Sequence, residues 1–465
     1  MIERTIGYPR RPLPDWVRPP WKPGQLFAMT ETARRFHRDT SLLKAMAGGL
    51  GAAKTLTLCS EGIRMGFRHL GKVGGLFEPT IPLVIDVLKP SLEGQLEAFG
   101  LRRGQDWIFR ATERAWLVLG GAQRGGFTIL GRPMLEWERI IGINLAWAGM
   151  DEPARAPAEA LAKVSDRTRG GPVFLAGTPD PGTWFAKWVK NPPPGASVHR
   201  ASTLENPYVR QSGIDQLMRD YDAVSIRAYL YGESVEIAGN AYHRFVNAPY
   251  PAGNILPCQY DPRLPLYIAT DNNTNPKPAV LFQLVAGQMR CFTEIQVYGG
   301  AWDPLAEAVH ARVGGVKPNG IGLHGDVTDR HVSAKSASAG WGGYGDFRDE
   351  LVRVFGGVEV QLMVPAGNPL ELARVSITNG WLCNAAGERR LVIDPMCTHL
   401  IADMESVSVD DNGRLRKPGR AGGQGIEKGL TDHSDAIGYA CVVESERQRS
   451  SRTGRPLFLT ADLKL

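Results

Sequence analysis

The sequence predicts an α/β protein of two domains, and three observations support this. A chain of 465 residues is too long for one compact core. From about residue 25 to residue 235, short apolar runs alternate with helix-like stretches, a pattern that predicts a mostly parallel, doubly wound sheet. A second α/β pattern begins near residue 265, after a stretch rich in Pro, Gly and Asn.

These patterns predict five parts of the chain. We expect an extended N-terminal arm at 1–24, a first domain at 25–246, a linker at 247–264, a second domain at 265–450 and a tail at 451–465. The arm is rich in proline and arginine, which disfavours regular structure.

The composition is that of an ordinary globular protein with a mild basic excess. Hydrophobic residues make up 43% and charged residues 22%, and no apolar run is long enough to span a bilayer. Six scattered cysteines without a C-x-x-C pair argue for reduced thiols and against a disulfide framework or a zinc ribbon. The net charge of +6 favours a polyanionic partner, although a solvated surface accounts for it as well.

The stretch GGLGAAKT, residues 48–55, differs at one position from the phosphate-binding pattern G-x-x-x-x-G-K-[ST], because Ala53 replaces the second glycine. An apolar strand precedes the glycines and a helix-like stretch follows them, an order that points backbone N–H groups at phosphate oxygens. Lys54 would then reach the phosphates and the Thr55 hydroxyl would help to hold Mg²⁺. A plain glycine turn before a helix is the alternative. The predicted ATP-binding residues of the loop are Gly48, Gly49, Gly51, Ala53, Lys54 and Thr55.

Two further strand ends supply groups that a nucleotide site needs. The run NLAWAGMDEPA ends in Asp151, expected to help hold Mg²⁺, and Glu152, expected to orient or deprotonate the attacking water. The run PVFLAGTPDPG places a hydroxyl at Thr178, where it could sense the γ-phosphate. Each stretch taken alone is equally typical of a solvated turn.

A second set of carboxylates lies in the C-terminal half. Asp271 and Asp326 each follow an apolar strand, and Asp432 and Asp435 share one side of a predicted helix start. Such carboxylates can hold two Mg²⁺ or Mn²⁺ ions about 4 Å apart for phosphodiester hydrolysis. They are also common as turn and cap residues, and Asp432 alone could cap the helix. Glu294 lies on a predicted strand, where we expect an exposed position, with an approach to the metal ions as the alternative, and we expect Tyr344 either to stack on a ligand or to pack internally.

These motifs together resemble those of the large terminase subunit of tailed bacteriophages. KPGQLFAM around Gln25 is similar to the adenine-contacting segment of that family, and GGLGAAKT, WAGMDE and LAGTPDPG follow in the family's order. TLENPYV (203–209) and YLYGESVEIAGNAYHRF (229–245) are similar to the stretch that closes its ATPase domain. Ala53 departs from the pattern of the family.

The resemblance implies a P-loop NTPase domain followed by an RNase H-like nuclease domain. ATP hydrolysis with Mg²⁺ would drive double-stranded DNA into a procapsid, and a nuclease with two Mg²⁺ or Mn²⁺ ions would cut concatemeric DNA. It also implies coupling through Thr178 and metal binding by Asp271, Asp326 and Asp435, with Asp432 either a fourth ligand or the true third one.

The implied partners are double-stranded DNA, a small terminase subunit and the portal protein of the procapsid, on which the chain would form a homo-oligomeric ring, with no membrane. The implied location is the host cytoplasm, outside the mature virion. An arginine finger is also implied, for which Arg124, Arg132 and Arg139 are the candidates.

Two alternatives remain open at this point. One is a P-loop DNA helicase or recombination enzyme that carries an unrelated nuclease, although further helicase motifs are missing. The other is a DNA-binding scaffold without catalytic activity, in which Ala53 marks a decayed nucleotide site.

Overall fold

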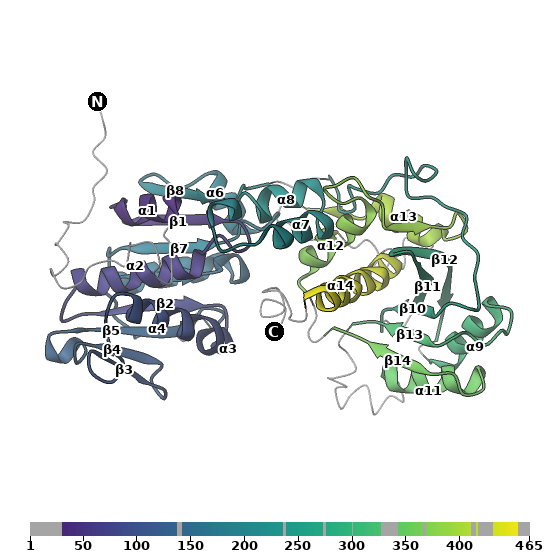
Figure 1. Ribbon diagram of the computed structural model, residues 1–465, viewed down its shortest axis with the longest axis horizontal. Coiled ribbons are helices and arrows are strands. Elements are labelled where there is room, and N and C mark those ends of the chain that lie inside the picture. Colours follow the sequence, from purple (N-terminus) through teal and green to yellow (C-terminus); the bar gives the residue numbers. More distant parts are fainter. Residues whose placement is uncertain are drawn as a thin grey trace. The chain divides into compact units, whose positions relative to one another are not determined.

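The computed structural model describes residues 30–136, 142–235, 239–272, 276–299, 301–326, 343–365, 369–410, 415–416 and 431–453, with side chains up to residue 449. The chain divides into two compact units (Figure 1). The described residues of Met1–Ile214 and Ile226–Glu236 form the first, and those of Asp215–Ser225 and Ile237–Leu465 form the second. Residues 247–264 belong to the second unit, while the domain limits drawn from the sequence stay predictions.

An eight-stranded sheet forms the centre of the first unit, in the order β3-β4-β5-β2-β6-β7-β1-β8. Strands β5, β2, β6, β7, β1 and β8 run parallel, and β3 and β4 add an antiparallel edge. The mostly parallel sheet predicted from the sequence is therefore confirmed. Its strands are β1 (Leu43–Gly48), β2 (Val73–Glu78), β3 (Trp107–Arg110), β4 (Ala115–Val118), β5 (Phe127–Pro133), β6 (Ala148–Asp151), β7 (Val173–Gly177) and β8 (Ala196–Ala201).

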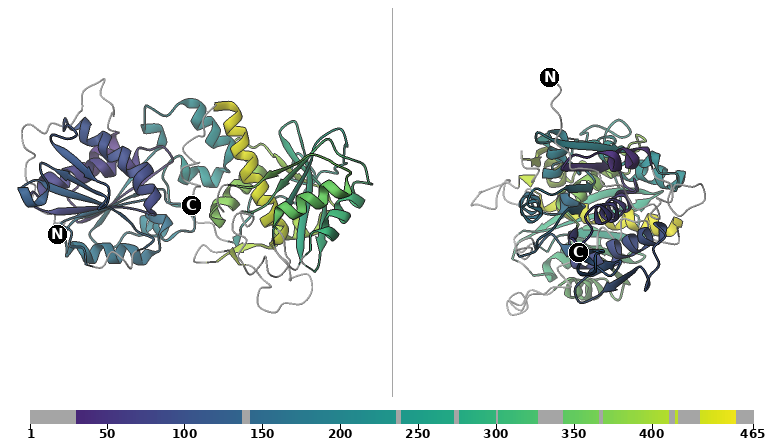
Figure 2. Two further views of the ribbon diagram at one scale, coloured as in Figure 1. Left: turned by 90° about the horizontal axis from the view of Figure 1, so that it is seen from below. Right: turned by 90° about the vertical axis from the view of Figure 1, so that its left-hand side faces the viewer.

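Helices cover both faces of this sheet (Figure 2). Along β1, Met46 belongs to the core that includes Leu58 and Ile63 of α2, whereas Ala45 and Ala47 face the core on the opposite side. Burial on both faces explains why these strands read as nearly continuous apolar runs. The helices of this unit are α1 (Glu31–Arg38), α2 (Lys54–Arg68), α3 (Ile81–Leu83), α4 (Lys89–Ala98), α5 (Ala158–Thr168) and α6 (Trp184–Lys190). Two more, α7 (Gln211–Asp220) and α8 (Ala223–Tyr229), each have residues in both units.

A six-stranded mixed sheet forms the centre of the second unit, in the order β14-β13-β10-β11-β12-β15. Strands β10, β11 and β12 pair antiparallel, and β13, β14 and β15 join in parallel. The strands are β10 (Leu266–Thr270), β11 (Lys277–Val285), β12 (Gln288–Val297), β13 (Ile321–His324), β14 (Val360–Met363) and β15 (Leu391–Ile393). A small second sheet contains β9 (Gly239–Asn240), β16 (Ser408–Val409) and β17 (Leu415–Arg416).

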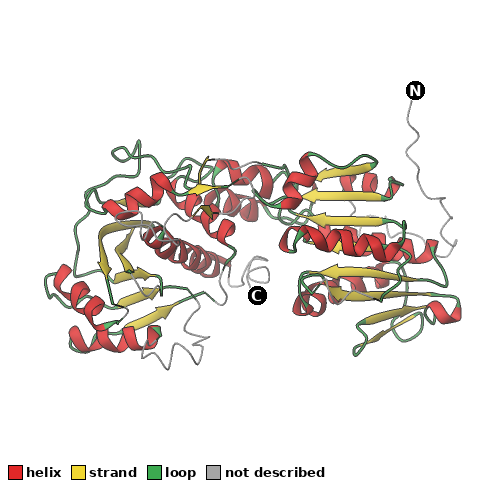
Figure 3. Ribbon diagram, turned by 180° about the vertical axis from the view of Figure 1, so that it is seen from behind, coloured by secondary structure: helices red, strands yellow, loops and turns green. Residues whose placement is uncertain are grey.

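Different helices cover the two faces of the six-stranded sheet (Figure 3). One face buries Ile268 with side chains of α9 and α11, including Leu305 and Phe347. Helix α14 packs against β10, β11 and β13. Helices α12 and α13 in turn pack against α14. The helices are α9 (Asp303–Arg312), α11 (Tyr344–Val354), α12 (Glu371–Leu382), α13 (Thr398–Ser406) and α14 (Asp432–Thr453). Within the described part of the chain, no helix is long and apolar enough to cross a membrane.

Candidate nucleotide and metal sites

The loop between β1 and α2 follows a path that two of its glycines make possible. A Cβ atom on Gly49 would lie 2.6 Å from the carbonyl oxygen of Tyr229, a distance that real Cβ atoms do not reach. Gly51 has a φ of +79°, in the left-handed region that glycine adopts without strain. Close packing and backbone conformation thus explain the glycines in GGLGAAKT.

Segments from the end of the first unit hold this loop in place. The Thr203 hydroxyl donates to the carbonyl oxygen of Leu50 at 2.8 Å, and the Asn206 amide donates to that of Gly51 at 2.7 Å. The Leu50 N–H in turn donates to the carbonyl oxygen of Tyr229 at 2.6 Å. The stretches around residues 203–209 and 229 therefore brace the predicted phosphate loop directly.

Ala53 occupies a strained position at the start of α2. Its φ is 60° and its ψ is 32°, the left-handed conformation, which an alanine adopts at a cost of roughly 1–2 kcal/mol. The G-x-x-x-x-G-K-[ST] pattern has glycine here, and this backbone geometry explains why. The loop keeps its shape with alanine, so the departure from the pattern acts through strain and not through a different fold.

The residues expected to carry nucleotide chemistry lie close together. The Thr55 hydroxyl donates to Oδ2 of Asp151 at 2.5 Å. The Nζ atom of Lys54 donates to the carbonyl oxygen of Gly49 at 3.1 Å and lies 3.4 Å from Oε1 of Glu152. The structure therefore brings the loop and the predicted acidic pair into one site.

The strand order explains this convergence. Strand β7 lies between β1 and β6, so the carboxyl ends of three parallel strands share one edge of the sheet. Thr178 follows β7, and its N–H donates to Oε2 of Glu152 at 3.3 Å. Glu152 has a φ of 43°, and backbone strain of this kind occurs often at functional sites.

Two buried oxygens in this site have no hydrogen-bond partner among the residues that the structure describes. They are Oδ1 of Asp151 and the hydroxyl oxygen of Thr178. Burial raises the pKa of Asp151 to about 7, with the neighbouring carboxylate of Glu152 as the second cause. The negative charge of the Asp151 carboxylate is therefore poorly compensated. A magnesium ion with a nucleotide would supply the missing positive charge and polar contacts, and hydroxyl and carboxylate oxygens are the ligands it prefers. The residues present therefore fit Mg²⁺ with a nucleotide.

The remaining ATP-site candidates are only partly visible. Gln25 and Arg139 lie outside the described residues. Arg132 donates to the carbonyl oxygens of Glu113 at 2.7 Å and Gly131 at 2.8 Å, so its guanidinium is already engaged within its own unit. Arg124 ends a short 3₁₀ turn and is exposed.

Three of the predicted nuclease carboxylates come from three different elements of the second unit. Asp271 directly follows β10, Asp326 lies two residues beyond β13, and Asp435 lies in the first turn of α14. Strands β10 and β13 are parallel neighbours, so their carboxyl ends share an edge of the sheet. Helix α14 packs against both of these strands.

All three of these carboxylates act electrostatically on the Tyr439 side chain. Burial raises the pKa of Tyr439 and Arg374 lowers it, while all three carboxylates lie near enough to raise it further. Asp271 and Asp326 also act together on Lys277, whose pKa is lowered by burial to about 8 and raised by both carboxylates. Carboxylate oxygens are the ligands that Mg²⁺ and Mn²⁺ prefer, so the chemistry of these three side chains is compatible with either ion.

Several neighbours of this carboxylate cluster were not predicted from the sequence. Arg374 of α12 donates to Oδ1 of Asp435 at 2.7 Å. The Tyr344 hydroxyl donates to Oδ1 of Asp326 at 2.7 Å, so Tyr344 packs internally instead of stacking on a ligand. Lys277 lies 3.7 Å from the centre of the Trp302 ring and donates to Asn272 at 3.2 Å. These residues carry no motif, because distant parts of the chain bring them together.

Asp432, the fourth predicted carboxylate, begins helix α14. The capping of that helix comes from Asp403 in α13, whose two oxygens accept from the N–H groups of Thr431 at 3.1 Å and Ser434 at 2.9 Å. Whether Asp432 or Asp435 is the third metal ligand stays a prediction.

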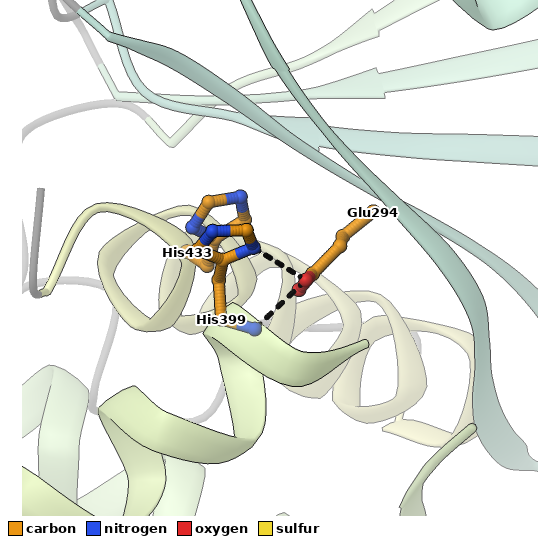
Figure 4. A group of neighbouring side chains, drawn as sticks. All are labelled: Glu294, His399 and His433. Atoms are coloured by element: carbon orange, nitrogen blue, oxygen red, sulfur yellow. Dashed lines mark hydrogen bonds and ion pairs between the residues drawn. The ribbon is translucent and has the colours of Figure 1, made fainter. Parts of the chain in front are cut away.

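Glu294 does not occupy the exposed position expected from the sequence, because it is only 8% exposed. Its carboxylate accepts from the backbone N–H group of His399 at 2.8 Å, at the start of α13 (Figure 4). It also accepts from the backbone N–H group of Leu400 at 2.9 Å. Nδ1 of His399 is also 2.8 Å away. His433 completes the group, and burial lowers its pKa to about 4 against the opposing effect of Glu294. Its ring is therefore neutral near pH 7.

Comparison with known proteins gives the same fold over nearly the whole chain. The large terminase of a thermophilic bacteriophage is 15% identical, with 89% of this chain and 98% of that chain covered and a TM-score of 0.61. The same terminase in complex with ADP is 16% identical, with coverage of 88% and 98% and a TM-score of 0.60. Its complex with ATP-γ-S is 15% identical, with coverage of 89% and 98% and a TM-score of 0.59. No family model and no curated protein sequence matches. The predicted two-part α/β fold of the large terminases is thus confirmed.

Proposed function

We propose that this chain is a viral DNA-packaging subunit that hydrolyses ATP to move double-stranded DNA and cuts the DNA with a metal-dependent nuclease. The observation that carries the proposal is the convergence of Lys54, Thr55, Asp151, Glu152 and Thr178 at one sheet edge. The terminase with the same fold was solved with ADP and with ATP-γ-S, which supports a nucleotide at this edge.

In the proposed ATPase cycle, nucleotide binding replaces contacts that the loop now makes with itself. Lys54 exchanges its bonds to Gly49 and Glu152 for the phosphates, which leaves Glu152 free to orient the attacking water. Thr55 and Asp151 hold Mg²⁺, which when bound neutralises charge that develops on the phosphates. Thr178 donates its N–H to Glu152, and its hydroxyl has no partner within the described ranges, so Thr178 can couple the γ-phosphate to the carboxylate of Glu152.

In the proposed nuclease, the carboxylates of Asp271, Asp326 and Asp435 hold the metal ions, with Asp432 as a fourth or alternative ligand. Two such ions, when bound, activate a water and stabilise the leaving oxygen of a phosphodiester. Tyr344 and Arg374 orient two of these carboxylates through bonds of 2.7 Å. Lys277 is buried beside Asp271 and Asp326, where its positive charge offsets part of theirs.

One experiment with two variants tests the proposal. Purified chain is assayed for ATP hydrolysis and, with Mn²⁺, for plasmid cleavage, beside Glu152→Gln and Asp271→Asn. We expect the first variant to lose hydrolysis but keep nucleotide binding, and the second to lose cleavage but keep hydrolysis. Matched controls are Glu113→Gln and Asp349→Asn, which alter exposed carboxylates paired with Arg110 in the first unit and Arg348 in the second.

The outcomes also separate the alternatives. If the unaltered chain hydrolyses no ATP and cuts no DNA, a scaffold without catalytic activity is favoured. ATP-dependent separation of DNA strands would favour a helicase. Unchanged hydrolysis in Glu152→Gln would contradict the role of that residue.

The packaging role has its own assay. We expect ATP-dependent protection of double-stranded DNA from added nuclease when the chain, a portal-bearing procapsid and the small subunit are combined. Protection that persists with Glu152→Gln would contradict translocation driven by this ATPase site.

A further inference from the structure

Glu294, His399 and His433 form a compact group on the second unit. They come from β12, α13 and α14, and one ligand atom of each lies within 4.8 Å of those of the other two (Figure 4). The two imidazole rings are nearly parallel, with an interplanar angle of 17° and centroids 5.3 Å apart.

His433 is the unusual member of this group. It is only 1% exposed, and by geometric criteria neither ring nitrogen has a hydrogen-bond partner in the part of the chain that the structure describes, although the backbone of Ile295 lies close enough to act on the ring. Buried polar groups are almost always paired, because an unpaired one costs free energy on folding. A ligand that accepts a nitrogen lone pair would remove this cost.

Glu294 and His399 are arranged as a metal site requires. Nδ1 of His399 and Oε1 of Glu294 lie 2.8 Å apart, so an ion that replaces the proton between them would contact both atoms. The His399 side chain is 48% exposed, so an ion can enter from solvent. A helix cap explains the two backbone bonds that Glu294 accepts, but it does not explain the stacked pair of histidines.

We propose that Glu294, His399 and His433 bind one divalent transition-metal ion of the Zn²⁺ type. Two imidazoles and a carboxylate favour Zn²⁺ over Mg²⁺, because imidazole is a poor ligand for the harder ion. Three protein ligands leave a fourth position for water. The side chains need only close in by about an ångström or two from their present spacing to reach usual Zn²⁺ distances.

The ion would connect three elements of the second unit that lie close to the predicted nuclease carboxylates. Glu294 pairs with Val280 of β11, which pairs with Ala269 of β10, two residues before Asp271. His433 lies two residues before Asp435 on α14. A bound ion would therefore tie β12 and α13 to the first turn of the helix that carries a predicted nuclease carboxylate. The site does not depend on the proposed nuclease activity.

The test measures metal binding directly. The full chain carrying Asp271→Asn, treated with a chelator and then kept in excess Mg²⁺, is titrated with Co²⁺ and followed by visible absorption and by thermal unfolding. We expect one Co²⁺ per chain, an absorption band typical of nitrogen ligation, and a rise in Tm that Zn²⁺ reproduces.

The informative variant is His399→Ala, since its half-exposed ring is removed with little effect on folding. We expect its Co²⁺ affinity to fall at least about tenfold and the band to change. His310→Ala is the matched control, because His310 packs against Phe355 elsewhere in the same unit. His433→Asn should behave as His399→Ala does. Absence of Co²⁺ binding, or binding unchanged in His399→Ala, would overturn the proposal.

Discussion

At the scale of single residues, the nucleotide site combines strained backbone with unpaired polar atoms. Ala53 and Glu152 both have positive φ values, and Oδ1 of Asp151 and the Thr178 hydroxyl are buried without a partner among the residues that the structure describes. Strain of this kind persists only where surrounding structure enforces it. Here the enforcing contacts come from Thr203, Asn206 and Tyr229, which hold the loop from outside.

The strain at Ala53 can be tested by substitution. Ala53→Gly relieves roughly 1–2 kcal/mol of left-handed strain, offset by about 0.4–1 kcal/mol of unfolded-state entropy. We expect a net gain of up to about 1 kcal/mol in the free energy of unfolding, measured by denaturant titration of the chain. Ala52→Gly is the matched control, because Ala52 is buried and is absent from the positive-φ residues. That variant should lose stability, and an equal loss in Ala53→Gly would show that position 53 is unstrained.

At the scale of elements, the phosphate loop depends on a segment far along the chain. Thr203 and Asn206 bond to the loop from 153 and 155 residues away. The loop's own pattern was visible in the sequence, but this support was visible only as a resemblance. A local pattern reports which residues approach the phosphates, whereas long-range packing determines whether they are held there.

Removing the hydrogen bond from Thr203 to Leu50 should weaken ATP binding as well as stability, whereas a similar change away from the loop should weaken stability alone. Thr203→Val leaves the Leu50 carbonyl oxygen unpaired, and we expect a loss of about 1 kcal/mol in stability together with several-fold weaker ATP binding. Thr168→Val is the control, because its hydroxyl also bonds two carbonyl oxygens, of Ser165 and Gly171. It should lose similar stability and keep its affinity, as measured by titration calorimetry. If both variants bound ATP with equal affinity, Thr203 would not be needed to hold the phosphate loop for nucleotide binding.

Helix α14 shows the same dependence on a distant residue. Burial raises the pKa of Asp403 to about 7, although the N–H groups of Ser434 and Thr431 act to lower it. The folded state therefore holds this proton more tightly than the unfolded state, whose aspartate titrates near pH 3.8. The contribution of Asp403 to stability is thus fully present below about pH 4 and is lost as the pH rises through about 7.

Asp403→Asn should remove this pH dependence. We expect the variant to gain stability relative to the unaltered chain as the pH rises from 4 to 8, measured by thermal unfolding at each pH. Asp394→Asn is the matched control for the loss of an acceptor, because Asp394 also accepts from two backbone N–H groups, of Cys258 and Met396. A difference between Asp403→Asn and the unaltered chain that stays constant with pH would contradict the raised pKa.

At the scale of the whole molecule, the sequence predicted the two α/β parts well and their supporting contacts poorly. Apolar runs such as the one before Asp151 predict strands because buried parallel strands need apolar side chains on both faces. Strand ends then predicted where carboxylates collect. Arg374, Asp403 and Tyr439 could not be predicted, because their importance comes from helix packing. Glu294 was predicted wrongly, since a strand alternation does not reveal that α13 covers its side chain.

The proposed DNA motor makes a last prediction for the complete chain. A protein that grips a duplex through its phosphates releases counterions, so log K falls with log salt with a slope of about −0.9 per phosphate contacted. The net charge of +6 is consistent with such contacts. We expect the Kd of the Asp271→Asn chain for a duplex to rise at least about tenfold between 50 and 200 mM salt, a change that about two phosphate contacts suffice to produce. Fluorescence anisotropy with two duplexes of unrelated sequence measures it, and both should give the same slope. A flat response would contradict binding through the phosphates, while a strong preference for one duplex would mean that this chain itself reads DNA sequence.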